Sequence, residues 1–505
     1  MDSSSSNTVG KSPSLSDALF PILFLISLLV LSVYIFKGDA TWGPNQVVLI
    51  LSSLVASLVG MKNGVSWDTM NEGVVRSISQ ALPAIFILLG IGALIGTWAM
   101  SGTIATMIYY GLQILDPQNF YPSVIVVTAL VSASIGSSWT TAGTVGVGMI
   151  GIAHGLGMSE GITAGAIVSG SYFGDTLSPL SDTTNLAPAV AGTDLYTHIR
   201  HMLWTTVPSM ILATGIFALI GMNTTGGGAM EVREVTLRVL SQYYEITPWL
   251  LLPLALVMLM AFLRWKPFPV IIVGALIGGI FAVMFQPDMV IHYIDRPDLS
   301  SPLALIAGVW KAMYSGYEVA TGFPIVDKLL NRGGMGSMLE VIWLVLSALM
   351  FGGVMEAAGL LRRLLDAIIH LVKGTGSLIA TTLLTAFGLN VVTSDQYMSI
   401  VLTGRMYRLE FQRRGLAPEN LSRAVEDSGT LTSPLVPWSA CGAYMAATLG
   451  VATLSYLPYA FFNWINPLVA LVLGLAGWGV KRIEVTRVES TRRVREPHQN
   501  DAERS

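Results

Sequence analysis

The sequence predicts an all-α polytopic membrane protein with two inverted repeats, re-entrant hairpins and broken transmembrane helices, with about ten crossings in all. Three observations support this fold class. Of the 505 residues, 52% are apolar and only 12% are charged, whereas soluble domains usually carry about 25% charged residues. Apolar runs of roughly 20 residues, the length that a bilayer requires, recur along the chain. Several further apolar segments are interrupted by polar stretches rich in glycine and proline.

The composition also excludes several classes of protein. A net charge of −3 gives no basic excess that would indicate nucleic acid. The single cysteine, Cys441, excludes an intrachain disulfide framework and a cysteine-built metal site. No glycine-rich phosphate-binding motif supports ATP-driven pumping, and no histidine pairs with Cys, Asp or Glu at metal-site spacing. We therefore expect no cofactor, no transition-metal site, and the lipid bilayer as the main surroundings.

Uninterrupted apolar runs mark the simple spans, at 18–36, 44–60, 81–99, 203–222, 247–264, 268–286, 338–358 and 456–479. The first lacks a basic preceding region and a cleavage site, so it is interpreted as a retained anchor. We divide the chain into a disordered tail at 1–17, an extra N-terminal transmembrane helix at 18–43, a first inverted repeat at 44–222, a connecting loop and linking helix at 223–267, a second inverted repeat at 268–480 and a basic cytoplasmic tail at 481–505.

Four apolar segments are broken. Their breaks fall at Gly136–Thr144, Gly174–Asn185, Leu389–Gln396 and Glu426–Pro437. Irregular backbone at membrane depth persists only where protein or a wet cavity satisfies its polar groups. The alternative, four extramembrane loops between short helices, is disfavoured because both flanks of each break are apolar and no flank is long enough to span alone. We predict two re-entrant hairpins, at 122–154 and 376–404, and two broken crossings, at 161–192 and 421–450.

Short motifs recur in one order and indicate the repeat. Trp67-x2-Met70-x2-Gly73 recurs from Trp310, and Ser101-Gly102 recurs as Ala358-Gly359, 257 positions later. Ser178-Pro179-Leu180 recurs from Ser433, 255 positions later. An odd number of crossings separates the two copies, which inverts the second, so the hairpin tips are expected to meet near the midplane. Two amphipathic helices, at 103–115 and 360–371, are expected to lie in the interface.

The basic residues predict the orientation. The loops at 100–121, 155–160 and 451–455 contain no Lys or Arg, whereas the stretch from Lys481 to Arg495 is strongly basic. We therefore expect both termini in the cytoplasm and the protein in the inner or plasma membrane.

The breaks concentrate acidic and other oxygen-bearing side chains. A carboxylate at the bilayer centre costs roughly 2.5–3.5 kcal/mol, so such residues indicate function. Hard cations such as Na⁺ bind carboxylate, hydroxyl and carbonyl oxygens together, whereas inward-pointing helix N-termini would also suit an organic carboxylate. The candidate cation- and proton-binding residues are Ser137, Ser138, Thr140, Asp175, Thr176, Ser178, Asp182, Thr183, Thr184, Asn185, Asn390, Thr393, Ser394, Asp395, Glu426, Asp427 and Ser433.

Asp175 and Asp182 are the pair that the spacing favours, because the break around Pro179 lets both reach one cavity. Nearby carboxylates favour proton uptake in each other, so one site could hold either a proton or a cation. Alternatively, Asp182 is the N-cap of the helix after the break. Which of Glu426 and Asp427 faces the site stays open, because one of them could pair with Arg423 one turn earlier.

The string GDTLSPLSDTTNLAP at 174–188, within a longer match from Gly170 to Pro208, resembles the NhaC family of sodium/proton antiporters, as does the partner stretch from Glu426 to Gly450. The resemblance covers about 40–480. It implies inverted repeats with re-entrant hairpins. By resemblance, the cation site would involve Asp175, Ser178, Asp182, Thr183, Thr184 and Asn185 in the first repeat, and Asp395, Asp427 and Ser433 in the second. The family also includes members that exchange malate or lactate.

The function we expect is secondary antiport of cytoplasmic Na⁺, or Li⁺, against external H⁺, a reaction that serves pH homeostasis. The alternative is an organic-anion or amino-acid antiporter coupled to Na⁺ or H⁺, which a membrane-embedded Arg or Lys at a break would favour. An enzyme is not expected, because no histidine accompanies the many hydroxyl groups. The sequence leaves the oligomeric state open, a homodimer included, since transporters with moving cores are often dimers.

Overall fold

The computed structural model describes residues 12–36, 43–223, 229–323, 326–327, 330–369 and 372–483, and it confirms the all-helical prediction. Apart from two isolated bridges, these residues contain no β-structure. Eight of the described helices are long and apolar enough to cross a membrane, or ten if each of two bent pairs counts as one span. Broken helices occur in both halves, as predicted. The chain is therefore a multi-pass membrane protein.

The first helix begins earlier than predicted. Helix α1 (Leu15–Phe36) includes part of the segment expected to be a disordered tail. Ser14 Oγ accepts a hydrogen bond from the Asp17 backbone N–H (3.1 Å), and the Asp17 carboxylate accepts one from the Ser14 N–H (3.2 Å). This reciprocal cap satisfies donors that a helix start leaves unpaired and so starts the helix at the edge of the apolar run. The rest of the predicted tail, residues 1–11, lies outside the described residues.

The elements of the first half follow the predicted order. They are α2 (Pro44–Lys62), α3 (Trp67–Met100), α4 (Thr103–Ile114), α5 (Phe120–Ile135), α6 (Ser138–Thr141), a π-helical turn (Ala142–Gly146), α7 (Val147–Gly155), α8 (Glu160–Leu177), α9 (Asp182–Ala191) and α10 (Leu195–Met222). The connecting region contains α11 (Ala229–Tyr243) and α12 (Leu252–Phe262).

The second half repeats much of this order. It comprises α13 (Pro267–Phe285), α14 (Pro287–Ile294), α15 (Ser301–Ser315), α17 (Leu339–Ala357), α18 (Leu360–Ile369), α19 (Thr375–Thr393), α20 (Gln396–Arg413), α21 (Pro418–Val425), a π-helical turn (Glu426–Thr430), a 3₁₀ turn (Ser433–Leu435), α22 (Ala440–Leu449), α23 (Thr453–Tyr456) and α24 (Phe461–Ala476). Of the predicted interfacial helix at 360–371, the last two residues lie outside the described part of the chain.

Residues in the left-handed conformation recur at a nearly constant offset. Gly102 and Gly359, which precede α4 and α18, are 257 positions apart; Gly136 and Ser394, at the hairpin tips, are 258 apart, as are Gly192 and Gly450 after α9 and α22. The same sharp turns are thus built twice. The predicted match between Trp67 and Trp310 does not follow this offset. Trp67 is the first residue of α3, whereas Trp310 lies within α15, so the two residues are not equivalent in the structure.

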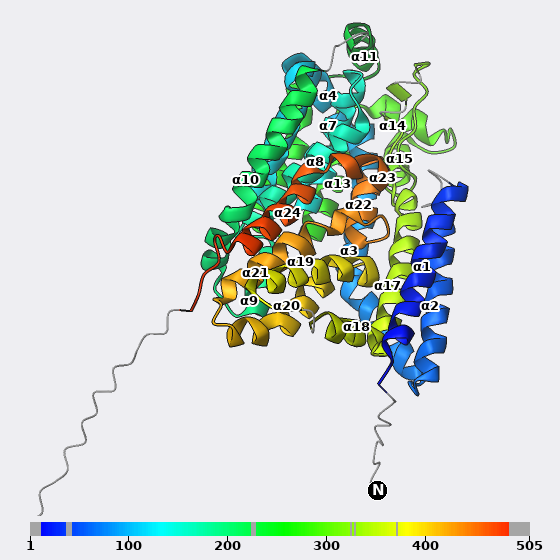
Figure 1. Cartoon of the computed structure of the whole chain (residues 1–505). Coiled ribbons are helices and arrows are strands. Elements are labelled where there is room, and N and C mark those ends of the chain that lie inside the picture. Colours follow the sequence, from blue (N-terminus) through cyan, green and yellow to red (C-terminus); the bar gives the residue numbers. More distant parts are fainter. Residues whose placement is uncertain are drawn as a thin grey trace, which may run out of the picture.

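The long helix α3 packs against α13, α15 and α17 and forms a frame beside the broken elements. Figure 1 shows α4 and α18 at opposite ends of the molecule, as expected if the second copy is inverted. The hairpin α19–α20 and the short helices α9, α21 and α22 gather next to this frame (Figure 1). The exact repeat boundaries stay a prediction.

The orientation can be tested by labelling. In a background in which the buried Cys441 is replaced by Ala, Gln118→Cys and Asp298→Cys should react with an impermeant maleimide in intact cells, because the positive-inside rule puts their loops outside. Gln412→Cys should react only in everted vesicles. All three side chains are exposed, so labelling reports sidedness rather than burial. The reverse pattern would contradict the predicted orientation.

Candidate functional site

The break in the first half separates α8 from α9. Helix α8 ends at Leu177, just before a Ser-Pro pair, because a residue that precedes proline avoids the helical conformation. Ser181 is the N-cap of α9 and accepts a hydrogen bond from the Thr184 N–H (3.3 Å). Asp182 is therefore the first residue of the helix, not its cap, and its side chain is exposed.

The tip of the first hairpin meets this break at Asp175. After Gly136 the chain turns, and Ser138 donates to the Asp175 carboxylate oxygen Oδ2 from its backbone N–H (3.2 Å) and its hydroxyl (2.7 Å). Thr184 Oγ1 donates to the Asp175 backbone carbonyl (3.0 Å). Asp175 is 6% exposed. The hairpin and the broken helix are therefore joined at one buried carboxylate.

The second hairpin is built in the same way with different residues. Its tip is Ser394, and Asp395 is the N-cap of α20, where its Oδ1 accepts from the Met398 N–H (2.8 Å). The Ser394 carbonyl accepts from the Ala440 N–H (2.9 Å) at the start of α22. The Asn390 amide donates to the Gly429 carbonyl (2.7 Å) within the π-helical turn. The hairpin thus satisfies backbone that the second break leaves unpaired.

Glu426 and Asp427 are adjacent in the second break but face different neighbours. Asp427 Oδ1 accepts from Thr205 Oγ1 (3.0 Å) on α10 and Asn466 Nδ2 (2.6 Å) on α24. Its Oδ2 lies 4.0 Å from Arg423 Nε. Glu426, in contrast, lies near Asp175. The structure therefore decides the question that the sequence left open: Asp427 pairs with Arg423, and Glu426 faces the first break.

Glu426 has an unusual environment. Its side chain is fully buried, and no described residue donates a hydrogen bond to either of its carboxylate oxygens. The hydroxyl groups of Thr183 and Thr430 are its polar neighbours, and neither lies in hydrogen-bond geometry with its carboxylate. A buried unpaired polar group costs about 1–3 kcal/mol, and more if charged. A negative charge on Glu426 would therefore need a counter-charge nearby.

Further buried oxygens around the second break also have no donor within the described part of the chain. They include Asn390 Oδ1, Ser394 Oγ, Asp427 Oδ2, Thr430 Oγ1 and Ser433 Oγ. Carboxylate, amide and hydroxyl oxygens are the ligands that hard cations prefer. No group of three or more His, Cys, Asp or Glu residues that could hold a metal ion occurs among the described residues. The donor set thus suits an alkali cation.

The remaining predicted residues support the break geometry. Thr176 and Thr393 donate to carbonyls of their own helices, and Asn185, which is exposed, donates to the Pro179 and Ser181 carbonyls. Three others bond within the loops: Ser137 Oγ accepts from the Thr140 N–H (3.2 Å) and from its hydroxyl (3.1 Å), Ser178 Oγ accepts from the Leu180 N–H (3.4 Å), and Thr183 Oγ1 bonds with Ser181 Oγ (3.1 Å).

Sequence reasoning missed two tyrosines. Tyr172 is buried near Asp175 and Cys441, and its hydroxyl has no hydrogen-bond partner among the described residues. Tyr397 lies near Asp175, Asp182 and Asp395, and its side chain is 40% exposed. Both flank a predicted aspartate by two or three residues, which is the signal that could have identified them.

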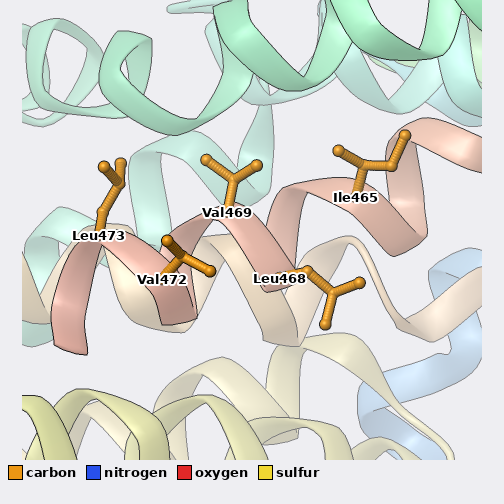
Figure 2. A pocket seen from close by; sticks show the side chains of 5 residues that line it. All are labelled: Ile465, Leu468, Val469, Val472 and Leu473. Carbon is orange, nitrogen blue, oxygen red and sulfur yellow. The ribbon is translucent and has the colours of Figure 1, made fainter. Parts of the chain in front are cut away.

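Two cavities adjoin the broken elements. One, of about 340 Å³, lies between α17 and α22–α23 and is lined by residues that include Arg332, Glu340 and Pro437, the last of which belongs to the second break. The other, of about 220 Å³, runs along α24, and Figure 2 shows its aliphatic lining of Ile465, Leu468, Val469, Val472 and Leu473. A wholly apolar hollow suits a lipid chain and not an ion.

A multi-pass helical protein whose broken helices bring buried carboxylates from two repeated halves together is a membrane transporter of the secondary active class. The comparisons with known proteins agree with this class. Residues 170–478 match the model of the Na⁺/H⁺ antiporter family. The chain therefore belongs to this family.

Relatives of known name extend the match over most of the chain. The Na⁺/H⁺ antiporter NhaC of Alkalihalophilus pseudofirmus is 37% identical over 90% of this chain and 94% of its own length. The malate-2H⁺/Na⁺-lactate antiporter of Bacillus subtilis is 35% identical over 91% and 95%. The arginine/ornithine antiporter ArcD of Halobacterium salinarum is 36% identical over 93% of each chain.

The close contact between Gly136 at the first hairpin tip and the break between α8 and α9 can be tested by adding one methyl group at Gly136. A Cβ at Gly136 (φ 76°) would lie 2.8 Å from the Leu180 carbonyl carbon and 2.9 Å from the Ser181 nitrogen. We expect Gly136→Ala to destabilise the protein by more than the about 1–2 kcal/mol that left-handed backbone alone costs. Gly157→Ala, at φ 66° with open space around its Cβ, should show only that smaller loss. Equal melting temperatures of the two purified variants would contradict the tight junction.

Proposed function

We propose that this protein exchanges cytoplasmic Na⁺, or Li⁺, for external H⁺ at a site formed by Asp175 and Glu426. One observation carries the proposal: a fully buried carboxyl group without any hydrogen-bond donor lies beside a second buried carboxylate. Two adjacent negative charges without water repel each other strongly, so the pair needs a counter-charge or a proton. Na⁺ and H⁺ both meet this need, and they compete for it.

The surrounding residues define how the ion would be held. Asp175 is oriented by Ser138, and the backbone on either side of the break is fixed by Thr184. On the opposite side, the hydroxyl oxygens of Thr430 and Ser433 and the side-chain oxygen Oδ1 of Asn390 offer neutral ligands that no hydrogen bond occupies. A cation would bind between charged oxygens of both halves and neutral oxygens of the second, which fits the mixed oxygen sets of hard cations.

Two approaches to the site support alternating access. Asp182, Asn185 and Tyr397 are exposed on α9 and α20, whereas the 340 Å³ cavity reaches the second break at Pro437 from the side of α22 and α23. By the positive-inside rule the α9–α20 side is cytoplasmic. We propose that Na⁺ is admitted from this side and that protons reach Glu426 from the side of the cavity.

Asp175→Asn and Glu426→Gln should each abolish Na⁺-dependent proton movement in everted vesicles, because a neutral amide can neither balance Na⁺ nor release a proton. Asp182→Asn should raise the apparent KM for Na⁺ by less than about tenfold, since the exposed Asp182 keeps its solvation. Asp298→Asn, in an exposed loop pair with Arg296, is the matched control and should exchange normally. Normal exchange by Glu426→Gln would refute the proposed pair.

Competition predicts a specific pH dependence. If one site holds either ion, the apparent KM for Na⁺ should rise as the pH falls, by up to about tenfold per pH unit once the proton form dominates, while the maximal rate at saturating Na⁺ stays constant. Initial rates at several Na⁺ concentrations and pH values measure both quantities. A maximal rate that falls with pH at unchanged KM would show instead that protons act away from the cation site.

An organic-solute antiporter is the second candidate. Relatives named as malate/lactate and arginine/ornithine antiporters share this scaffold at 35% and 36% identity, and the cavity near Pro437 has room for a small solute. Arg423 is a buried cation at the second break, 2% exposed, but Asp427 already faces it at 4.0 Å. It therefore offers little to an organic anion, and this favours a cation alone.

The two candidate functions predict different proton movements in proteoliposomes. With a Na⁺ gradient and no organic solute, proton movement is expected under the first proposal. If protons move only when malate, lactate or arginine is present, and the labelled solute crosses with them, the second candidate is correct.

A further inference from the structure

Arg423 is a buried cation that the ion-exchange step does not use. It lies one turn before Asp427, with its Nε 4.0 Å from Asp427 Oδ2, and its guanidinium also donates to the Gly479 carbonyl (3.1 Å). Gly479 follows α24, so Arg423 connects the break to a distant part of the chain. His201 on α10 lies near Arg423 and also near Lys481 and His198. Lys481 in turn pairs with Glu419 on α21 (Nζ–Oε1 3.4 Å).

The segment 477–483, here called the strap, is bound tightly to the turn between α20 and α21. The Lys481 carbonyl accepts from the Ala417 N–H (3.0 Å) and from Asn420 Nδ2 (2.7 Å). The Lys481 N–H donates to Asn420 Oδ1 (3.0 Å), and the Ile483 N–H donates to the Gly415 carbonyl (2.9 Å). The strap therefore fixes the start of α21, the helix that carries Arg423.

Helix α24, which precedes the strap, also holds the break directly. Asn463 Nδ2 donates to the Leu431 carbonyl (2.9 Å), and Asn466 Nδ2 donates to Asp427 Oδ1 (2.6 Å). Both asparagines are fully buried. Asp427 is thus held by α10 and α24 through Oδ1, and its Oδ2 lies beside Arg423 on α21, so its orientation is fixed. Because it precedes Asp427 in the same π-helical turn, Glu426 is then directed to the opposite side, toward Asp175.

We infer that Arg423 is a positioning residue for ion exchange: held by the strap, it neutralises Asp427 and so leaves Glu426 as the one unbalanced acid of the second break. This inference rests on the proposed function. Its physical basis is that two unbalanced carboxylates next to each other would both take up protons or cations, and the site would lose its selectivity for exchange at one of them. Buried ion pairs can specify one arrangement of side chains more than they stabilise the fold, and we assign this role to the pair of Arg423 and Asp427.

The test is a charge-balanced double variant. Arg423→Gln should raise the apparent KM for Na⁺ at least about tenfold, because Asp427 then competes as an unbalanced carboxylate. Arg423→Gln combined with Asp427→Asn removes both charges and should restore the KM to within about threefold of the wild type. A role in folding alone would lower the amount of inserted protein and leave the KM of the inserted fraction unchanged.

Three results would overturn the inference: an unchanged KM in Arg423→Gln, a double variant that inserts normally but stays as impaired as the single one, or loss confined to protein yield. If Arg423→Gln does not insert into the membrane, Asn420→Ala provides the test instead. This variant removes the Asn420 hydrogen bonds to Lys481 in the strap and keeps Arg423. A raised KM for Na⁺ supports the inference, and an unchanged KM contradicts it. Normal exchange by Glu426→Gln would instead defeat the proposed function, so the two failures are distinguishable.

Discussion

A carboxyl group removed from water and left without a hydrogen-bond donor is the constraint on which this structure depends. Glu426 is in that position, and Asp175 lies beside it. Such a group is neutral or paired with a cation, because the charged form alone is too costly in a medium of low polarity. The rest of the fold brings the two acids together from different halves of the chain.

Breaking a helix inside a membrane frees backbone groups, and most of the polar residues around the site satisfy them. Thr184 binds the Asp175 carbonyl, Asn390 binds the Gly429 carbonyl, and Asn463 binds the Leu431 carbonyl. Irregular backbone is stable here only because these side chains replace the missing water. Many residues of the polar motifs are thus needed to satisfy the backbone groups at the breaks. Only a few remain that could contact an ion.

The two halves are alike in backbone and unlike in chemistry. The turns at Gly136 and Ser394 are equivalent, yet the next residue is Ser137 in one half and Asp395 in the other, and both cap the following helix. The first half satisfies its acid, Asp175, with two donors from Ser138, whereas the second leaves Glu426 with none. Under the proposed function, this asymmetry would give the two acids different tasks: Asp175 would be a fixed ligand, and Glu426 would exchange its proton for the cation.

The sequence by itself determined the helical membrane fold, the positions of the breaks and the set of acids, because hydropathy, glycine, proline and intramembrane charge act locally along the chain. Helix boundaries such as Pro44–Lys62 and Pro267–Phe285 lie within a few residues of the predicted runs. Only the tertiary structure decided which acids meet. Asp175 and Asp182 are neighbours in sequence, but a capped helix start turns Asp182 outward. Glu426 and Asp427 are chemically similar, and contacts of Asp427 with α10, α21 and α24 turn them in different directions. The sequence could not decide this, because Thr205 on α10 is 222 positions away from Asp427.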